Sequence, residues 1–253
     1  MRFLPLVLLS LVACAPSDPA PQLETPADSL AMAVIDAHGG WEAWTTLPTL
    51  RFDWAVIRDS AEVVRVRHLW DRTAQRARVE WETGEDSTAV SILDLATSTP
   101  DSPVGEAWLN GEPAPPADSL VSAAYARFIN DSYWMIAPFK TFDPGVRRGL
   151  EPDSASGDVK VLTLDFGDVG MTPGDRYWLF VRPDGTLERW TYVLEGSSSA
   201  STWAWSDPAD VDGPNGTVTV LTRKSRPDGT AIITEPGTAP GPEAWTSPSP
   251  VLQ

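Results

Sequence analysis

Residues 50–82 read LRFDWAVIRDSAEVVRVRHLWDRTAQRARVEWE, and three segments of this stretch alternate apolar with polar side chains. A period of two places successive side chains on opposite faces of a β-strand. The polar breaks at residues 58–61 and 71–74 are short enough for hairpins. We therefore predict an antiparallel meander with a charged face and an aromatic inner face. The predicted inner face consists of Leu50, Phe52, Trp54, Val56, Val64, Val66, His68, Trp70, Ala77, Val79 and Trp81.

Two other segments have helical rather than strand periodicity. Leu30, Val34 and Ile35 recur at helical spacing, and the helix they predict ends at His38. A second helical pattern is expected to stop before Pro138, because the residue preceding a proline disfavours helical dihedral angles. Its apolar positions are expected to plug or cover the sheet, and they are Val121, Tyr125, Phe128, Trp134 and Ile136.

Strand-like segments return after this central helix. They lie at residues 159–166, 176–182, 186–195, 201–205 and 217–224. Pro-Asp-Gly turns follow the second and the fifth of these segments. Residues 236–253 are rich in Pro, Gly, Ser and Thr, so we predict that they are disordered. The folded domain is therefore expected to cover residues 28–235 and to be mainly β (α+β).

The composition of the chain restricts its partners. Its 253 residues include 35 acidic and 19 basic side chains, which give a net charge of −16. A nucleic-acid-binding protein needs a basic face, so we expect no nucleic acid as a partner. The 12 Trp residues indicate a wide interior filled by large side chains.

The N-terminus has the pattern of a secretory signal. Residues 1–13 combine an early Arg with a short apolar run and small residues. Residues 11–14 (LVAC) resemble a bacterial lipobox, which implies acylation of Cys14, for example with palmitate, and a stable membrane anchor. An ordinary signal peptide with a chance cysteine is the alternative. If the LVAC motif is a lipobox, residues 14–27 form the lipidated, Pro-rich tether. Ala15 follows the cysteine and, by resemblance to Gram-negative sorting signals, implies the outer membrane, facing the periplasm or the cell surface.

Several local motifs resemble uncharacterised bacterial lipoproteins of the LolA/LolB-like superfamily. They are AHGGW at 37–41, NDSYW at 130–134, PFK at 138–140, DPGV at 143–146, GDRYWL at 174–179 and ERW at 188–190. The resemblance implies an incomplete antiparallel β-barrel with an N-terminal helix and a central helical plug. It also implies a hydrophobic hollow that receives acyl chains.

The leading hypothesis is a membrane-anchored lipoprotein that binds a lipid or acyl chain in such a half-barrel cavity. The candidate cavity residues are Phe52, Trp54, Val56, Val64, Val66, Trp70, Val79, Trp81, Tyr125, Phe128 and Trp134. The same side chains could instead fill a solid core, which would suit a structural or interaction module of the cell envelope. The sequence names no protein partner for either case.

Signals for catalysis and metal binding are weak. The chain has two histidines, His38 and His68, whereas a catalytic zinc site needs three protein ligands. His68 is expected to be a hydrogen-bonded core residue, and His38 to suit the C-terminal end of a helix dipole. Carboxylates near Trp could support a hydrolase of envelope polymers, and the candidates are Asp131, Asp143, Asp165, Asp168 and Glu188. Because no positioned acid–base group is visible, we expect no enzyme, no cofactor and no metal.

Overall fold

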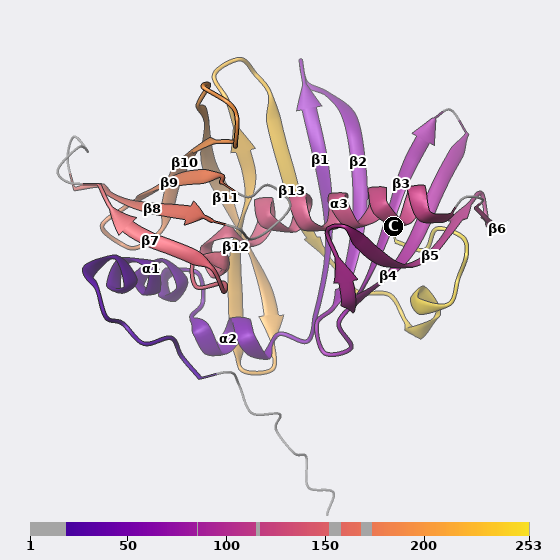
Figure 1. Ribbon diagram of the computed structural model, residues 1–253, viewed down its shortest axis with the longest axis horizontal. Helices are drawn as coiled ribbons and strands as arrows, with labels where there is room; N and C mark the ends of the chain where they lie inside the picture. The colour runs from indigo at the N-terminus through magenta and orange to yellow at the C-terminus, as the bar shows by residue number, and fades with distance from the viewer. Residues whose placement is uncertain (1–18, 85, 115–116, 152–157, 168–173, 253) are drawn as a thin grey trace, which may run out of the picture.

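The computed structural model describes residues 19–84, 86–114, 117–151, 158–167 and 174–252. Within these residues, 13 antiparallel strands form one sheet in the order β6-β5-β4-β3-β2-β1-β13-β12-β11-β10-β9-β8-β7 (Figure 1). The sheet does not close on itself, because β6 and β7 lie at its two edges. An open antiparallel sheet with a central helix confirms the predicted fold class.

Each half of the sheet is a meander of sequential strands. The first half contains β1 (Thr49–Arg58), β2 (Ala61–Asp71), β3 (Arg76–Gly84), β4 (Ser87–Thr99), β5 (Ser102–Leu109) and β6 (Glu112–Pro113). The second half contains β7 (Val146–Leu150), β8 (Lys160–Phe166), β9 (Arg176–Val181), β10 (Leu187–Val193), β11 (Ser201–Gly213), β12 (Gly216–Ser225) and β13 (Ala231–Gly237). Pairing of β1 with β13 joins the two halves.

The helices lie against this sheet. They are α1 (Pro26–Ala37), α2 (Trp41–Thr46), α3 (Ala117–Ile136), and the 3₁₀ helices η1 (Ala137–Lys140) and η2 (Pro242–Trp245). Figure 1 shows α3 running across the strands, and it contacts β3, β4 and β5 of one half and β12 of the other. The face that α3 covers is called the inner face below, and the opposite face the outer face.

The alternation in residues 50–82 sets the register of the first three strands. Trp54 of β1 lies opposite Val66 of β2, which lies opposite Trp81 of β3. Val66 and Trp81 are buried, and Trp54 is half-buried. The predicted meander with an aromatic inner face is therefore confirmed.

The central helix contributes to the cores of both halves. Tyr125 and Phe128 pack with Val79 and Trp81 of β3. Trp134 in the last turn of α3 packs in a second cluster, with side chains from β7 to β13. Full burial of one such side chain stabilises the fold by about 1.5–3 kcal/mol. The amphipathic helix therefore holds the two meanders together.

The prediction of disorder for residues 236–253 is wrong for the part that the structure describes, which ends at residue 252. Pro236 and Gly237 belong to β13, and η2 follows a few residues later. Leu252 is buried and packs with Leu69 of β2. The prediction was wrong because the composition of this segment does not show that another part of the chain binds it.

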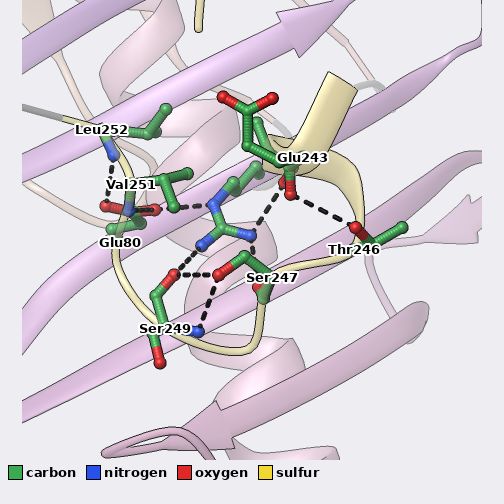
Figure 2. A network of polar contacts seen from close by, with 9 residues as sticks. Glu80, Glu243, Thr246, Ser247, Ser249, Val251 and Leu252 are labelled. Atoms are coloured by element: carbon green, nitrogen blue, oxygen red, sulfur yellow. Dashed lines mark hydrogen bonds and ion pairs between the residues drawn. The ribbon is translucent and has the colours of Figure 1, made fainter. Parts of the chain in front are cut away.

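Two buried charges on the outer face of β3 hold this C-terminal segment (Figure 2). Arg78 donates three hydrogen bonds of 2.6–2.8 Å to backbone oxygens, those of Ala244, Ser247 and Ser249. Glu80 accepts hydrogen bonds of 2.9 and 3.0 Å from two backbone N–H groups, those of Val251 and Leu252. The segment is thus recognised mainly through its backbone.

Candidate functional site

A buried polar pair fixes α3 to the inner face. His68 of β2 is fully buried, and its Nε2 lies 2.9 Å from Oδ2 of Asp131 on α3. The His68 ring stacks on Phe52 with a centroid separation of 4.6 Å. Asp131 also accepts a hydrogen bond from the side chain of Asn130. The expectation that His68 is a hydrogen-bonded core residue is confirmed. Asp131, a candidate catalytic carboxylate, is the hydrogen-bond partner of His68.

The first half of the inner face is filled. Five of the candidate cavity residues are buried there against one another and against small side chains of β4 and β5. They are Val66, Val79, Trp81, Tyr125 and Phe128. Phe52 and Trp134 are buried as well, in the two neighbouring clusters. Under most of α3 the solid-core interpretation therefore holds.

The second half of the inner face, together with the adjoining β1, is covered less completely. A set of half-buried side chains, called here the aromatic surface, packs against a floor of buried indoles. The aromatic surface consists of Trp54, Val56, Tyr133, Phe166, Tyr177 and Tyr192, and the floor consists of Trp134, Trp190, Trp203 and Trp205. Adjacent rings are in contact, since the Tyr133–Trp190 and Tyr177–Trp190 centroids are 5.4 and 5.2 Å apart.

Several polar atoms in this region have no hydrogen-bond partner among the described residues. They are the indole nitrogens of Trp54, Trp190, Trp203 and Trp205 and the hydroxyl of Tyr133. Burial raises the pKa of Tyr133 well above its ordinary value, so its hydroxyl keeps its proton. Buried polar groups normally have partners, and each unpaired group costs about 1–3 kcal/mol.

A buried lysine lies beside the indole floor. Lys224 of β12 is fully buried, and its Nζ donates to the backbone oxygen of Leu221 and to Oγ1 of Thr234, each at 2.5 Å. The same nitrogen lies 4.6 Å from the centroid of the Trp205 ring. Burial lowers the pKa of Lys224 well below its ordinary value, because the charged form loses its hydration.

The four remaining candidate cavity residues are more exposed than the others. Trp54 and Val56 are half-buried in the aromatic surface. Trp70 is half-buried at the other end of β1 and β2, where its ring contacts Trp44 and Phe128. Val64 is also solvent-accessible, at 38%, and it belongs to none of the buried clusters.

Sequence reasoning did not assign Tyr133, Tyr177, Tyr192 or Lys224 to the site. Tyr177 and Tyr192 share the period-two alternation of their strands, so the signal for an inward position was present. Lys224 has the parity of the inward-facing Val218 and Val220 on the same strand. The proximity of Tyr133 on α3 to these strand residues depends on long-range pairing, which the local pattern does not contain.

The candidate catalytic carboxylates are dispersed. Asp143 pairs with Lys140, Asp165 lies 3.3 Å from Arg147, and Glu188 pairs with Arg189. Asp168 lies outside the described residues. In the part of the chain that the structure describes, no three His, Cys, Asp or Glu side chains gather to hold a metal ion.

His38 acts differently from the expected helix-dipole partner. It is the C-cap of α1 and is buried, with Nδ1 2.7 Å from the backbone oxygen of Val34. Burial lowers the pKa of His38, which favours the neutral ring. His38 therefore ends the helix through a hydrogen bond rather than through a positive charge.

Cys14 and the rest of the predicted signal lie outside the described residues, so lipidation stays a prediction. No helix in the described ranges is both long and apolar enough to cross a bilayer. An open pocket of about 580 Å³ lies where the chain enters α1. It includes none of the candidate cavity residues and is lined by Leu23, Glu24, Thr25, Pro26, Ser29, Leu30, Ala33, Leu150 and Lys160.

No protein-family model and no curated protein sequence matches this chain. Among solved structures, it is similar to a DUF1329 family protein from Desulfovibrio piger, with 11% identity and a TM-score of 0.45 over 84% of this chain and 91% of that one. It is also similar to a LolA superfamily protein from Nitrosomonas europaea, with 11% identity and a TM-score of 0.44 over 87% and 97%. A domain from Vibrio parahaemolyticus assigned to outer membrane lipoprotein sorting has 8% identity and a TM-score of 0.39 over 78% and 88%.

Proposed function

We propose that this protein is a lipoprotein of the bacterial envelope that binds an acyl chain or a similar hydrophobic molecule on its inner face. Cys14 would carry the lipid anchor, and the folded domain would face the periplasm or the cell surface at the outer membrane. The protein would bind its ligand without transforming it.

The observation that carries the proposal is the uneven cover of the inner face. Side chains between α3 and the first half of the sheet, such as Val79 of β3 and Phe128 of α3, are at most 3% exposed. The aromatic surface on the other half is half-buried, although its members are large and apolar. Leaving apolar surface in water costs about 25 cal/mol per Å², and contiguous patches of this kind usually mark binding sites.

The chemistry of the aromatic surface suits a long hydrocarbon chain. Tyr177 contacts Phe166, Trp190 and Tyr192 at centroid distances of 5.2–5.6 Å, so these four rings form a continuous band. Hydrophobic ligand sites are typically concave, mainly apolar and largely preformed. A sheet that stays open leaves this band accessible from one side.

A fluorescent fatty acid tests the proposal. The full chain carrying Cys14→Ser, which cannot be acylated, would be titrated with dansyl-undecanoic acid. We expect saturable binding that Tyr192→Asp weakens at least about tenfold, since a charge would have to be buried beside the acyl chain. Thr191→Asp is the matched control, because Thr191 is the preceding residue of β10 and points to the outer face. Equal effects of the two substitutions would contradict the assigned face.

The filled first half of the inner face favours one competing function. A protein whose core is entirely packed could serve as an envelope interaction module. In that case the unacylated chain would take up no fatty acid, and both aspartate variants would leave the fluorescence of the probe unchanged.

A further inference from the structure

Lys224 is a buried amine without a counter-ion among the described residues. Of the three lysines, Lys140 pairs with Asp143 and Lys160 is exposed, whereas Lys224 is fully buried. Its two acceptors, the Leu221 backbone oxygen and the Thr234 hydroxyl, carry no charge. Burying a cationic group without an opposite charge is costly, and folded chains normally supply a partner.

Unpaired hydrogen-bond donors lie in the same part of the core as Lys224. The adjacent Trp205 has an unpaired indole N–H, and so do Trp190 and Trp203, with side chains at most 6% exposed. Their rings form a chain of contacts, with centroid distances of 5.0 Å from Trp205 to Trp190 and 4.7 Å from Trp190 to Trp134. An indole nitrogen can donate a hydrogen bond but cannot accept one. What this region lacks is therefore an acceptor.

Strand register places Lys224 next to the aromatic surface. Lys224 of β12 lies opposite Ile232 of β13, and Ile232 lies opposite Val56 of β1. Thr234, which binds Lys224, lies opposite Trp54. Because Val56 and Trp54 belong to the aromatic surface, a chain lying on them would have its end close to the buried amine.

We propose that the ligand of the inner face is an acyl chain that ends in a carboxylate, and that Lys224 with the neighbouring indole N–H groups receives this carboxylate. The inference rests on the proposed function and specifies the ligand's head group. An ionised carboxylate only accepts hydrogen bonds, so it supplies what the region lacks. Its negative charge would also favour the protonated form of the Lys224 amine, which burial alone disfavours, and charge-assisted hydrogen bonds are about twice as strong as neutral ones. Since Nζ is buried, a neighbouring side chain such as the half-buried Trp54 has to rotate to admit the head group.

Three ligands with the same chain length test the head group. The full chain carrying Cys14→Ser would be titrated calorimetrically with dodecanoate, methyl dodecanoate and dodecan-1-ol. We expect dodecanoate to bind about tenfold or more tightly than the other two, as one charged hydrogen bond implies. Lys224→Met keeps an apolar side chain of similar length and should reduce this preference to less than about twofold while the alcohol still binds. Lys160→Met, which removes an exposed lysine, should leave the preference unchanged.

The outcomes separate the two hypotheses. If the Cys14→Ser chain with Lys224 in place binds dodecanoate and dodecan-1-ol equally well, the head-group assignment is wrong and acyl binding still stands. Retention of the preference in a folded Lys224→Met variant would overturn the role of Lys224. If none of the three ligands binds, the proposed function is wrong and the head-group assignment falls with it.

Discussion

Arg78 and Glu80 lie side by side on the outer face of β3, with Arg78 Nε 2.6 Å from Glu80 Oε1, and both side chains are at most 1% exposed. The C-terminal segment covers them and binds both through its backbone (Figure 2). Residues that are two positions apart on a strand point to the same face, so the spacing of Arg78 and Glu80 in the sequence places their charges together. A buried pair of this kind makes the last residues part of the fold.

Removal of the Arg78 charge should destabilise the domain strongly. Arg78→Met leaves Glu80 as an unpaired buried charge and leaves three backbone oxygens without their donor. We expect the free energy of unfolding to fall by about 3–5 kcal/mol, measured by urea denaturation. Arg58→Met, at an exposed position of β1, should change it by less than about 0.5 kcal/mol. Similar losses of unfolding free energy for the two variants would show that Arg78 does not hold the C-terminal segment.

The two glycines after α1 should respond differently to alanine. Gly39 and Gly40 both have positive φ, at 114° and 91°, so each substitution costs some backbone strain. A Cβ on Gly39 would lie 2.1 Å from the Thr217 backbone oxygen, whereas a Cβ on Gly40 would meet nothing within 4 Å. Thermal unfolding should therefore show Gly39→Ala to be less stable than Gly40→Ala by about 2 kcal/mol or more. Equal melting temperatures would mean that α1 does not approach β12 so closely.

Asp28 should make the stability depend on pH in the acidic range. It completes a capping box with Thr25 at the start of α1, and it accepts a hydrogen bond of 2.6 Å from Arg148 of β7. The Arg148 hydrogen bond is the main cause that lowers the Asp28 pKa from 3.8 to about 2. Because the folded value is the lower one, this stabilisation is complete above about pH 5 and is lost as the pH falls toward 2.

Asp28→Asn is the variant that isolates this contribution. At pH 7 we expect it to unfold about 1–2 kcal/mol more easily than the parent, and the difference should shrink as the pH approaches 2. Asp36→Asn, at an exposed position of the same helix, serves as the control. A difference that stays constant from pH 7 to pH 2 would show that the Asp28 charge does not contribute.

The His68–Asp131 pair should be more important to the fold than to any reaction. Asp131→Ala leaves Nε2 of His68 unpaired in a site where Nδ1 already has no described partner. We expect a loss of about 2–4 kcal/mol in urea denaturation, because α3 loses its polar contact with β2. Ser122→Ala, on the exposed side of α3, should have little effect. An Asp131→Ala variant of full stability would refute this role.

Local patterns in the sequence predicted the elements better than their partners. The alternation from Leu50 to Trp81 is enough to define β1–β3, because the pleat of a strand depends only on its own residues. The spacing of Tyr125 and Phe128 likewise defined the central helix. Neither pattern predicts that β1 pairs with β13 or that Arg78 binds the C-terminal segment, because both interactions join residues that are far apart in the chain.

The candidate site was predicted only in part for the same reason. The cavity residues named from the first meander include Val79 and Trp81, which are buried in a filled core. The aromatic surface is centred on Tyr177 and Tyr192 of the second meander, where Trp134 of α3 reaches the sheet. Placing these groups together requires knowing which strands the last turn of α3 covers, and periodicity does not give that information.

The central claim is that an acyl chain lies on the aromatic surface, and fluorescence quenching by a brominated fatty acid tests it most directly. Bromine quenches tryptophan only at short range, and Trp54, Trp134, Trp190, Trp203 and Trp205 all lie on or beneath this surface. Titration of the Cys14→Ser chain with 9,10-dibromostearate should quench a large part of the emission in a saturable way, and unbrominated stearate should reverse it by competition. Emission that stays unchanged at saturating dibromostearate would contradict the claim.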